Sequence, residues 1–256
     1  NKLRNHDFYD LVIDMQGLLK SAIVSKLLPS KQIVGFDKFS AREKISSIFY
    51  HKTFRCSYET NVIERNLALI GYALDVNFKK EDIQNKAPFL FSQVSTLNIP
   101  ISESKKNILI IPGASHITKR YPAIKLAEIA NVIDANFYVI WGNSEEKILA
   151  KKIKELSPNV HICNKLSIDS LILLISKMRL VIGPDTGPTH IAWGLNIPSI
   201  TLFGPTPGYR NSFESSVNKI LESDSRVNPT EINKADYSIK NIDLQKILST
   251  AKELLK

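Results

Sequence analysis

The fold class is decided by the stretch Leu180-Val181-Ile182-Gly183-Pro184-Asp185-Thr186-Gly187-Pro188-Thr189-His190. Its first residues are apolar, which is typical of a buried strand. The glycines and prolines that follow are typical of a tight turn, and the last residues are typical of the start of a helix that continues from Ile191 onward. Pro188 suits a first helical position, because its missing N–H would have no helical partner there. The unpaired N–H groups of a helix start attract anions. The stretch therefore predicts an α/β sheet with a phosphate site at its edge.

Strands and helices alternate on both sides of this turn. The spacing of apolar residues predicts strands at 108–111, 137–141, 160–162, 180–182 and 199–203, and helices at 122–133, 145–156, 168–176 and 243–255. Consecutive βα units form a parallel sheet with helices on both faces, and ligands bind at the carboxyl ends of its strands. The C-terminal half is therefore expected to be one such domain.

The N-terminal half shows a second α/β pattern. We expect strands at 11–14 and 32–35 and helices at 18–28, 41–50 and 60–70, the last of them ended by Gly71. Pro100 and polar residues near it predict a linker at about 100–106, which divides the chain into domains 1–101 and 102–256. Because the chain opens without methionine and enters a strand almost at once, we also expect the first domain to lack its first segment.

Composition narrows the class of protein. The 256 residues are 43% hydrophobic and 23% charged, which is typical of a folded globular chain. The formal net charge of +9 favours an anionic partner, although solubility alone also explains it. Cys56 and Cys163 are too few for a disulfide framework or a cysteine zinc site, which favours a reducing compartment. No apolar run reaches the length of a membrane span, and no signal-peptide pattern is present.

Unusual residues follow three of the predicted strands. They are Pro112 to Ser115 with Lys119, Trp141 to Asn143, and Gly183 to His190. The carboxyl ends of these strands should share one sheet edge, as a nucleotide site requires. Lys119, with Arg120 beside it, can neutralise a pyrophosphate and the charge of a leaving group.

Asp185 and His190 are harder to assign. A carboxylate repels phosphate, so we expect Asp185 to brace the turn through backbone N–H groups or to accept from a sugar hydroxyl. His190 either binds phosphate or is a structural histidine.

Several kinds of chemistry lack their motifs. The sequence has no Asp-x-Asp metal motif, no metal-ligand spacing, no Gly-x-Ser-x-Gly and no Walker motif, so a metal cofactor, a serine hydrolase and a P-loop NTPase are disfavoured. A set of basic residues gathers in the first half: Lys20, Lys26, Lys31, Lys38, Arg42 and Lys44. They suit a phosphorylated or carboxylated acceptor, and a nucleic-acid groove stays open.

With these motifs the chain resembles glycosyltransferase family 9. The resemblance rests on Val12 to Ala22, Ala41 to Tyr50, Pro112 to Pro122, Trp141-Gly142, Asp185-Thr186-Gly187 with His190, and Phe203-Gly204-Pro205-Thr206. It covers nearly the whole chain. It implies a GT-B fold, in which two Rossmann-like domains face a cleft. It also implies an ADP-heptose donor and the Kdo sugar of lipid A as acceptor, with no nucleic acid and no bound cofactor.

The resemblance also implies roles for individual residues. On the donor side, the pyrophosphate would be held by Ser115, Lys119, Thr186 and Gly187, with Asp185 and His190 completing the pocket and Leu166 packing on adenine. Lys20 and Arg42 match basic positions on the acceptor side, where they would pair with the carboxylate of Kdo or a lipid phosphate.

The implied reaction is an inverting displacement, in which Lys119 and Asp185 are catalytic candidates. The family's Gly-Asp segment, which holds the general base, would lie upstream of Asn1, so Asp14 is a weak substitute and slow turnover is expected. The implied location is the cytoplasmic face of the inner membrane of a Gram-negative bacterium, with peripheral contact to anionic lipid. Two alternatives stay open: another family 9 transferase that acts on a heptosylated acceptor, and a non-catalytic nucleotide- or RNA-binding module.

Overall fold

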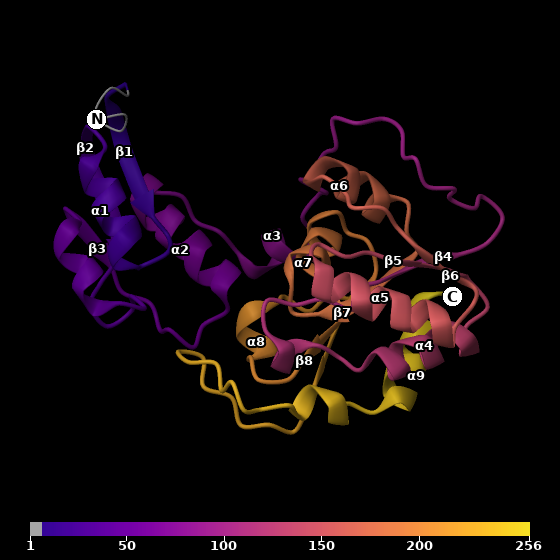
Figure 1. Cartoon of the computed structure of the whole chain (residues 1–256). Coiled ribbons are helices and arrows are strands. Elements are labelled where there is room, and N and C mark those ends of the chain that lie inside the picture. Colours follow the sequence, from indigo (N-terminus) through magenta and orange to yellow (C-terminus); the bar gives the residue numbers. More distant parts are fainter. Residues whose placement is uncertain (1–6) are drawn as a thin grey trace. The chain divides into compact units, whose positions relative to one another are not determined.

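The computed structural model describes residues 7–256, which form two compact units, one ending at Asn85 and one beginning at Lys86 (Figure 1). The second unit thus begins earlier than the expected boundary at residue 101. The reason is that Leu97, Ile99 and Ile101 pack against the core of the second unit, and Phe89 N donates to Gly194 O at 3.2 Å. The expectation that the first domain lacks its first segment concerns sequence outside the described residues and stays a prediction.

The N-terminal unit is built on a small parallel sheet. Its strands are β1 (Tyr9–Asp14), β2 (Ser30–Phe36) and β3 (Lys52–Phe54), paired in the order β1-β2-β3. Its helices are α1 (Leu19–Leu27), the 3-10 helix η2 (Lys44–Phe49), α2 (Val62–Leu74) and α3 (Lys80–Gln84). Val34 and Phe36 of β2 pack with Leu69 of α2, so the central strand carries the core of this unit.

Two helices of this unit differ from the sequence prediction. The predicted helix 41–50 is wrong in its first part, because the Asp37 carboxylate accepts hydrogen bonds from Phe39 N and Ser40 N and stabilises a turn instead, so only the 3-10 helix η2 forms. The predicted helix 60–70 continues through Gly71 to Leu74 and is capped by Asp75, which has a left-handed φ of 57°. β3 and α3 were not predicted, because they are too short to show a periodicity.

The C-terminal unit is a parallel sheet of six strands in the order β6-β5-β4-β7-β8-β9. The strands are β4 (Asn107–Ile110), β5 (Asn136–Val139), β6 (Val160–Ile162), β7 (Leu180–Pro184), β8 (Ser199–Phe203) and β9 (Asn218–Glu222). The α-helices are α4 (Ala123–Val132), α5 (Ser144–Leu156), α6 (Ile168–Ser176), α7 (Gly187–Gly194), α8 (Gly208–Asn211) and α9 (Leu244–Leu254), and the 3-10 helices are η3 (Ile117–Lys119) and η4 (Ser238–Asn241). The predicted α/β class with parallel sheets is therefore confirmed.

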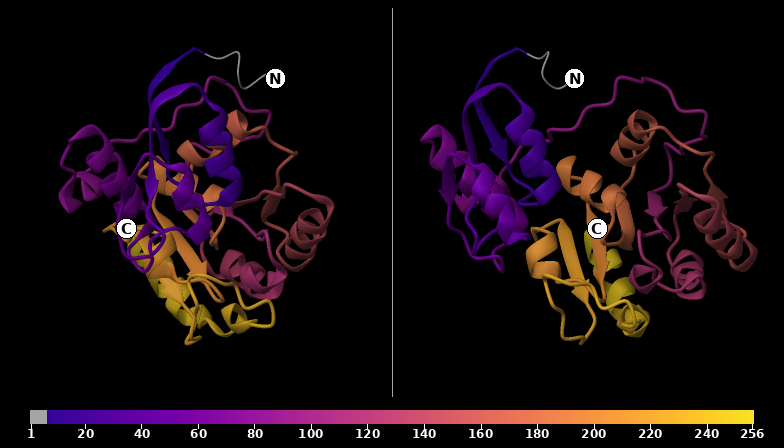
Figure 2. Two further views of the ribbon diagram at one scale, coloured as in Figure 1. Left: turned by 90° about the vertical axis from the view of Figure 1, so that its left-hand side faces the viewer. Right: turned by 60° about the vertical axis from the view of Figure 1, so that its left-hand side comes forward.

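Both faces of this sheet are buried, as a parallel sheet requires (Figures 1 and 2). Ile108 and Ile110 point to the face covered by α4, α5 and α9, whereas Leu109 and Ile111 point to the face covered by α6 and α7. Because successive side chains alternate along a strand, the four apolar residues in a row supply two cores.

The turn after β7 leads into a helix at the position that Pro188 predicted. Helix α7 begins at Gly187, with Pro188 in its first turn. Thr189 Oγ1 donates to Pro184 O at 2.7 Å, and Thr186 N donates to Thr189 Oγ1 at 3.3 Å, which closes the turn tightly. The helix start therefore lies immediately beside Asp185. β9 was not predicted, because its sequence mixes polar and apolar residues at the sheet edge.

Candidate active site

The candidate site lies where the strand order of the C-terminal sheet reverses. From β4 the chain continues to β5 on one side, and it later returns to β7 on the other side of β4. In open α/β sheets such a switch point leaves a crevice at the carboxyl ends of the strands. The loops after β4, β5 and β7 all begin at this edge, so the expectation that the motif-bearing strand ends share one edge is confirmed.

A buried ion pair joins the loops after β4 and β7. Lys119 Nζ lies 2.7 Å from Asp185 Oδ2, and both side chains are only 10% exposed. His190 Nε2 lies 3.0 Å from the other oxygen, Asp185 Oδ1. Thr206 Oγ1, from the loop after β8, donates to Asp185 Oδ2 at 3.1 Å. We call these residues, Lys119, Asp185, His190 and Thr206, the ion cluster.

Asp185 is the centre of the ion cluster. Burial by itself would raise the pKa of its carboxyl, but the hydrogen bond from His190 and the charge and hydrogen bond of Lys119 outweigh burial and lower the pKa to about 2. Asp185 is therefore a carboxylate at any physiological pH. It accepts from side chains and not from the backbone N–H groups that the sequence suggested, and it neutralises Lys119.

Two glycines near the ion cluster serve different purposes. A Cβ on Gly183 would lie 2.7 Å from the Cβ of Ile111, so this glycine permits β7 to approach β4 closely. A Cβ on Gly187 would meet nothing within 4 Å. Gly187 thus faces open surface at the start of α7, where a ligand could approach the backbone.

A cavity of about 230 Å³ lies beside the turn after β7. Its lining residues come from the ends of the central strands and from two helices: Ile111, Gly113, Ile140, Trp141, Gly142, Glu146, Leu166, Leu171, Thr186 and Pro188. Leu166, the predicted adenine contact, and Thr186, a predicted pyrophosphate contact, thus share one cavity. Apolar Ile140, Leu166 and Leu171 suit a flat base.

Glu146 lines this cavity and was missed by the sequence analysis. Its Oε2 accepts from Gly142 N at 2.6 Å, and its own N–H donates to Asn143 Oδ1 at 3.0 Å. The signal was present in the Asn-x-x-Glu pattern after strand 137–141, which is typical of a helix cap. A helix-capping carboxylate gives the same sequence pattern whether or not it also lines a cavity.

The remaining donor-side candidates lie around the ion cluster. Ser115 is exposed in the loop between β4 and α4, and Lys119 ends the short helix η3 of the same loop. His190 lies in the first turns of α7 with 40% of its side chain exposed. Ser115, Lys119, Gly187 and His190 do not line the 230 Å³ cavity, but Thr186 lines it and follows Asp185 directly. The cavity and the ion cluster are thus neighbours along the chain, and the roles of these residues stay predictions.

The acceptor-side candidates lie at the carboxyl edge of the N-terminal sheet. Lys20 is exposed in the first turn of α1, and Arg42 is exposed in the loop after β2. The two loops are tied together, because Leu19 N donates to Glu43 Oε2 at 2.6 Å and Glu43 N donates to Gly17 O at 3.0 Å. The structure therefore gives Lys20 and Arg42 a common support, and their role in binding an acceptor stays a prediction.

Asp14, the weak candidate for a general base, is 5% exposed at the end of β1. Its Oδ2 accepts from Ser21 Oγ and from Tyr50 OH, each at 2.8 Å, and its Oδ1 accepts from Gln16 N at 2.9 Å. Burial raises the pKa of Tyr50, which keeps this phenol a hydrogen donor. Asp14 therefore stabilises the turn into α1. Because both of its carboxylate oxygens already accept hydrogen bonds there, they are less available to accept a proton as a general base.

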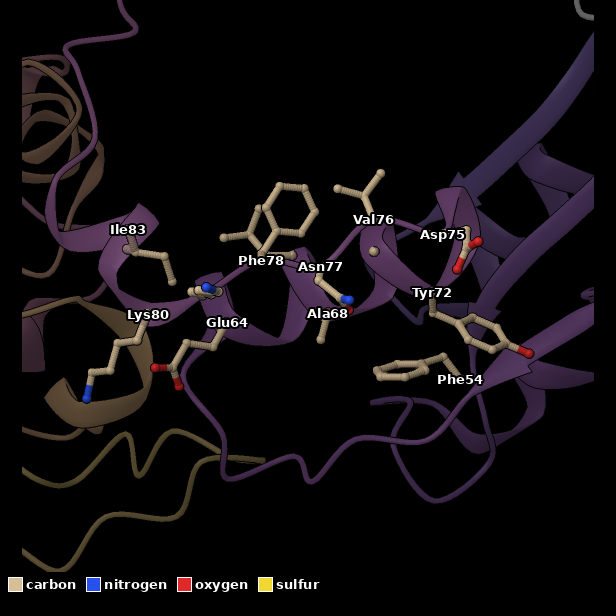
Figure 3. Close-up of a pocket in the computed structure, with 13 residues that line it drawn as sticks. Phe54, Glu64, Ala68, Tyr72, Asp75, Val76, Asn77, Phe78, Lys80 and Ile83 are labelled. Carbon is tan, nitrogen blue, oxygen red and sulfur yellow. The ribbon is translucent and has the colours of Figure 1, made fainter.

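A larger hollow of about 710 Å³ lies along α2 in the N-terminal unit (Figure 3). Phe54 and Tyr72 lie side by side in it, with ring centroids 5.2 Å apart, and Glu64 and Lys80 lie toward its other end. None of the predicted site residues lines this hollow. It is therefore separate from the candidate site.

Residues 7–256 contain neither a candidate metal cluster nor a candidate membrane-spanning helix. Within residues 7–256 no three His, Cys, Asp or Glu side chains are grouped so that they could hold a metal ion. In the same part of the chain no helix has the length and apolar character of a membrane span.

Solved structures with this architecture define the fold class. The structure of E. coli heptosyltransferase WaaC with ADP superposes with a TM-score of 0.76 and 20% identity, over 99% of this chain and 75% of that chain. E. coli ADP-heptose lps heptosyltransferase II superposes with a TM-score of 0.68, also at 20% identity, over 99% of this chain and 78% of that chain. The chain therefore has the GT-B fold of these transferases.

Sequence comparison identifies the family. The sequence profile of glycosyltransferase family 9 (heptosyltransferase) matches residues 1–232. Lipopolysaccharide heptosyltransferase 1 of Campylobacter coli is 38% identical over 96% of this chain and 76% of its own length. The chain belongs to glycosyltransferase family 9, and the resemblance of its motifs is confirmed.

More distant relatives carry the same name. Lipopolysaccharide heptosyltransferase 1 of Pseudomonas aeruginosa is 27% identical over 81% of this chain, and that of Escherichia coli K12 is 28% identical over 78%. This chain spans 58% and 62% of the lengths of these two relatives.

Proposed function

We propose that the chain acts as an inverting heptosyltransferase, which moves L-glycero-D-manno-heptose from ADP-heptose to the Kdo sugar of lipid A. The observation that carries this proposal is the 38% identity, over 96% of the chain, to a relative named lipopolysaccharide heptosyltransferase 1. The ion cluster and the neighbouring cavity support the nucleotide half of the proposal, because they combine an apolar slot with a cation beside a helix start.

In this proposal the donor lies along the carboxyl edge of the C-terminal sheet. Adenine packs on Leu166 and the apolar wall, and the Glu146 carboxylate accepts from ribose hydroxyls. The diphosphate lies at the start of α7, near Thr186 and Gly187, with Ser115 and Lys119 on its other side. Every one of these groups follows a strand of a single sheet, so the sheet fixes their spacing.

Heptose transfer breaks the bond between the anomeric carbon and the β-phosphate oxygen while an acceptor hydroxyl attacks from the opposite face. Negative charge then grows on the departing ADP, and Lys119 stabilises it more strongly than it stabilises the bound donor. Asp185 acts through Lys119 and His190, since it bonds to both, and is therefore a positioning residue. No metal ion is needed in this scheme, because Lys119 and the start of α7 supply the positive charge.

On the acceptor side, Lys20 and Arg42 pair with the carboxylate of Kdo or with a phosphate of lipid A. Since lipid A is anchored in a bilayer, the protein works at the cytoplasmic face of the inner membrane of a Gram-negative bacterium. Asp14 remains a weak candidate for the base that takes the proton of the acceptor hydroxyl. Because its oxygens already hold the turn into α1, we expect slow turnover by this chain.

A second acceptor is favoured by one comparison. Lipooligosaccharide heptosyltransferase 2 of Campylobacter jejuni is 26% identical over 96% of the chain. The second candidate function is therefore heptose transfer to an acceptor that already carries heptose, with the same donor site.

Thermal unfolding with ligands tests the donor, and product analysis tests the acceptor. ADP-heptose should raise the melting temperature more than ADP does, and an RNA oligonucleotide should not raise it, because only a ligand that binds the folded state stabilises it. A water-soluble Kdo sugar should accept heptose faster than a heptosylated sugar, as followed by mass spectrometry. The proposal is overturned if ADP-heptose gives no stabilisation, and the second candidate replaces it if the heptosylated sugar is preferred.

A further inference from the structure

Positive charge is concentrated in one segment of the N-terminal unit. Residues 15–56 contain eight lysine or arginine residues and two acidic ones, a formal net charge of +6 out of +9 for the whole chain. All eight basic residues are exposed: two lie on α1, one lies in β2 and one in β3, three lie in the connection between β2 and β3, and one directly follows β3. This segment therefore presents an excess of basic side chains to solvent.

Apolar side chains protrude from the same segment. In the connection between β2 and β3, Phe39 is 62% exposed, Ile45 is 55% exposed and Ile48 is 72% exposed. Lys38, Arg42 and Lys44 are exposed between them. We call these six residues the β2–β3 ridge. Exposing large apolar side chains to water is unfavourable, so a group of them within one short connection indicates a binding surface.

The ridge is held in place by the residues between its exposed side chains. Asp37 accepts from Phe39 N and from Ser40 Oγ, at 3.1 and 2.6 Å, and Ser46 is the fully buried residue of η2. Glu43 accepts from Leu19 N of α1. Asp37 and Glu43, the two acidic residues of the segment, thus accept hydrogen bonds from within the protein, whereas the lysines and Arg42 are exposed.

We propose that the β2–β3 ridge is the surface by which the protein binds an anionic lipid bilayer, an inference that rests on the proposed lipid-linked acceptor. Phe39, Ile45 and Ile48 enter the boundary between headgroups and acyl chains, and the three cations bind the anionic headgroups. A partner that binds through charge alone, such as RNA, would leave Ile45 and Ile48 exposed to water. A purely apolar protein partner would bury three unpaired cations.

The position of the ridge agrees with the acceptor site. Arg42 belongs to the ridge, and Glu43 ties the ridge to the turn that carries Lys20. Docking through the ridge therefore brings the anionic head of a membrane-embedded acceptor to the residues proposed to bind it. The lipid part of the acceptor then stays in the bilayer, and only its sugar enters the site.

Vesicle co-sedimentation tests this surface. The protein should bind vesicles of phosphatidylcholine mixed with phosphatidylglycerol, and it should bind phosphatidylcholine alone much more weakly. The double variant Ile45→Ser with Ile48→Ser should reduce binding to the mixed vesicles by about tenfold, because two apolar side chains no longer enter the boundary. A matched double variant, Leu74→Ser with Val132→Ser, removes side chains that are 54% and 53% exposed elsewhere, and it should bind as the unmodified protein does.

A pair of charge-reversal variants tests the lysines of the ridge separately from its apolar side chains. Lys38→Glu with Lys44→Glu should weaken binding to the mixed vesicles by more than about tenfold, while Lys246→Glu with Lys252→Glu on α9 should have little effect. Equal binding by the ridge variants and their controls would overturn the proposal, as would equal binding to neutral and anionic vesicles.

Transfer to the water-soluble Kdo sugar separates this inference from the proposed function. The ridge variants Ile45→Ser with Ile48→Ser should keep that activity and lose activity on acceptor embedded in vesicles. If vesicle binding is unaffected and soluble transfer persists, the surface is wrong and the function stands. If soluble transfer is absent while the protein still binds anionic vesicles through the ridge, the function is wrong and the surface stands.

Discussion

Replacing Lys119 by methionine separates two contributions of this side chain, one to folding and one to ligand binding. Methionine has nearly the same length and removes the charge. Because the Lys119 Nζ to Asp185 Oδ2 distance is 2.7 Å and each side chain is 10% exposed, the substitution leaves a buried carboxylate without its cation. Breaking such a pair costs about 3–5 kcal/mol, and we expect the low end because Asp185 keeps its bonds to His190 and Thr206.

The double variant Lys119→Met with Asp185→Asn makes the test specific. With both charges removed, no uncompensated charge is buried, so most of the lost stability should return. Affinity for ADP should not return, since the diphosphate still lacks its cation. Loss of one charge-assisted hydrogen bond costs about 1.5–3 kcal/mol, which corresponds to about 10- to 100-fold in the dissociation constant.

Urea unfolding and isothermal calorimetry measure these two quantities. Lys152→Met, on the exposed side of α5, is the matched control and should change neither. The reasoning fails if Lys119→Met is as stable as the unmodified protein, or if the double variant binds ADP with unchanged affinity. The first result would mean that the ion pair does not stabilise the fold, and the second that Lys119 does not contact the diphosphate.

Three further outcomes follow from the same region. The pKa of Asp185 is lowered from 3.8 to about 2, so its stabilising effect is complete above about pH 5 and is lost as the pH falls toward 2. Urea titrations at these pH values should show that the unmodified protein loses about 2 kcal/mol of stability that Asp185→Asn does not lose. Thr206→Val removes the hydroxyl that donates to Asp185 Oδ2, so it should shift the pH profile of ADP affinity measured by calorimetry. Thr206→Ser keeps a hydroxyl and should restore the profile. Identical profiles for the unmodified protein and both variants would refute a positioning role of Thr206. Gly183→Ala places a Cβ 2.7 Å from Ile111 Cβ and should lower the free energy of unfolding, followed by thermal unfolding, by about 1–3 kcal/mol. Gly187→Ala should leave the stability unchanged and weaken ADP binding instead. A Gly183→Ala variant as stable as the unmodified protein would contradict the close approach of β7 to β4.

The sequence predicted the C-terminal sheet well because its signals are local. Leu180, Val181 and Ile182 form an unbroken apolar run, and a strand buried on both faces needs no other pattern. The predicted strand 160–162 and helix 168–176 have the bounds that the structure gives to β6 and α6. The same reasoning failed at residues 41–50, where Asp37 bonds to nearby backbone N–H groups and competes with the helix.

The candidate site was predicted only where its residues follow strands. Lys119 and Asp185 were both singled out, but their direct bond was not, because they are far apart in the chain and only the pairing of β4 with β7 brings their loops together. Thr206 was noted as part of a motif without a role, for the same reason. Glu146 has a local signal, the helix cap, that hides its place in the cavity wall.

The bond between Asp185 and Lys119 has a consequence for selectivity. The ion cluster beside the cavity contains its own counter-ion, so a small anion gains little by binding there, since it must compete with a carboxylate already bound to the lysine. A nucleotide diphosphate brings two phosphates and a base, and the contacts of the base offset that competition. Free phosphate, although abundant in a cell, should therefore be a poor inhibitor of an enzyme built in this way.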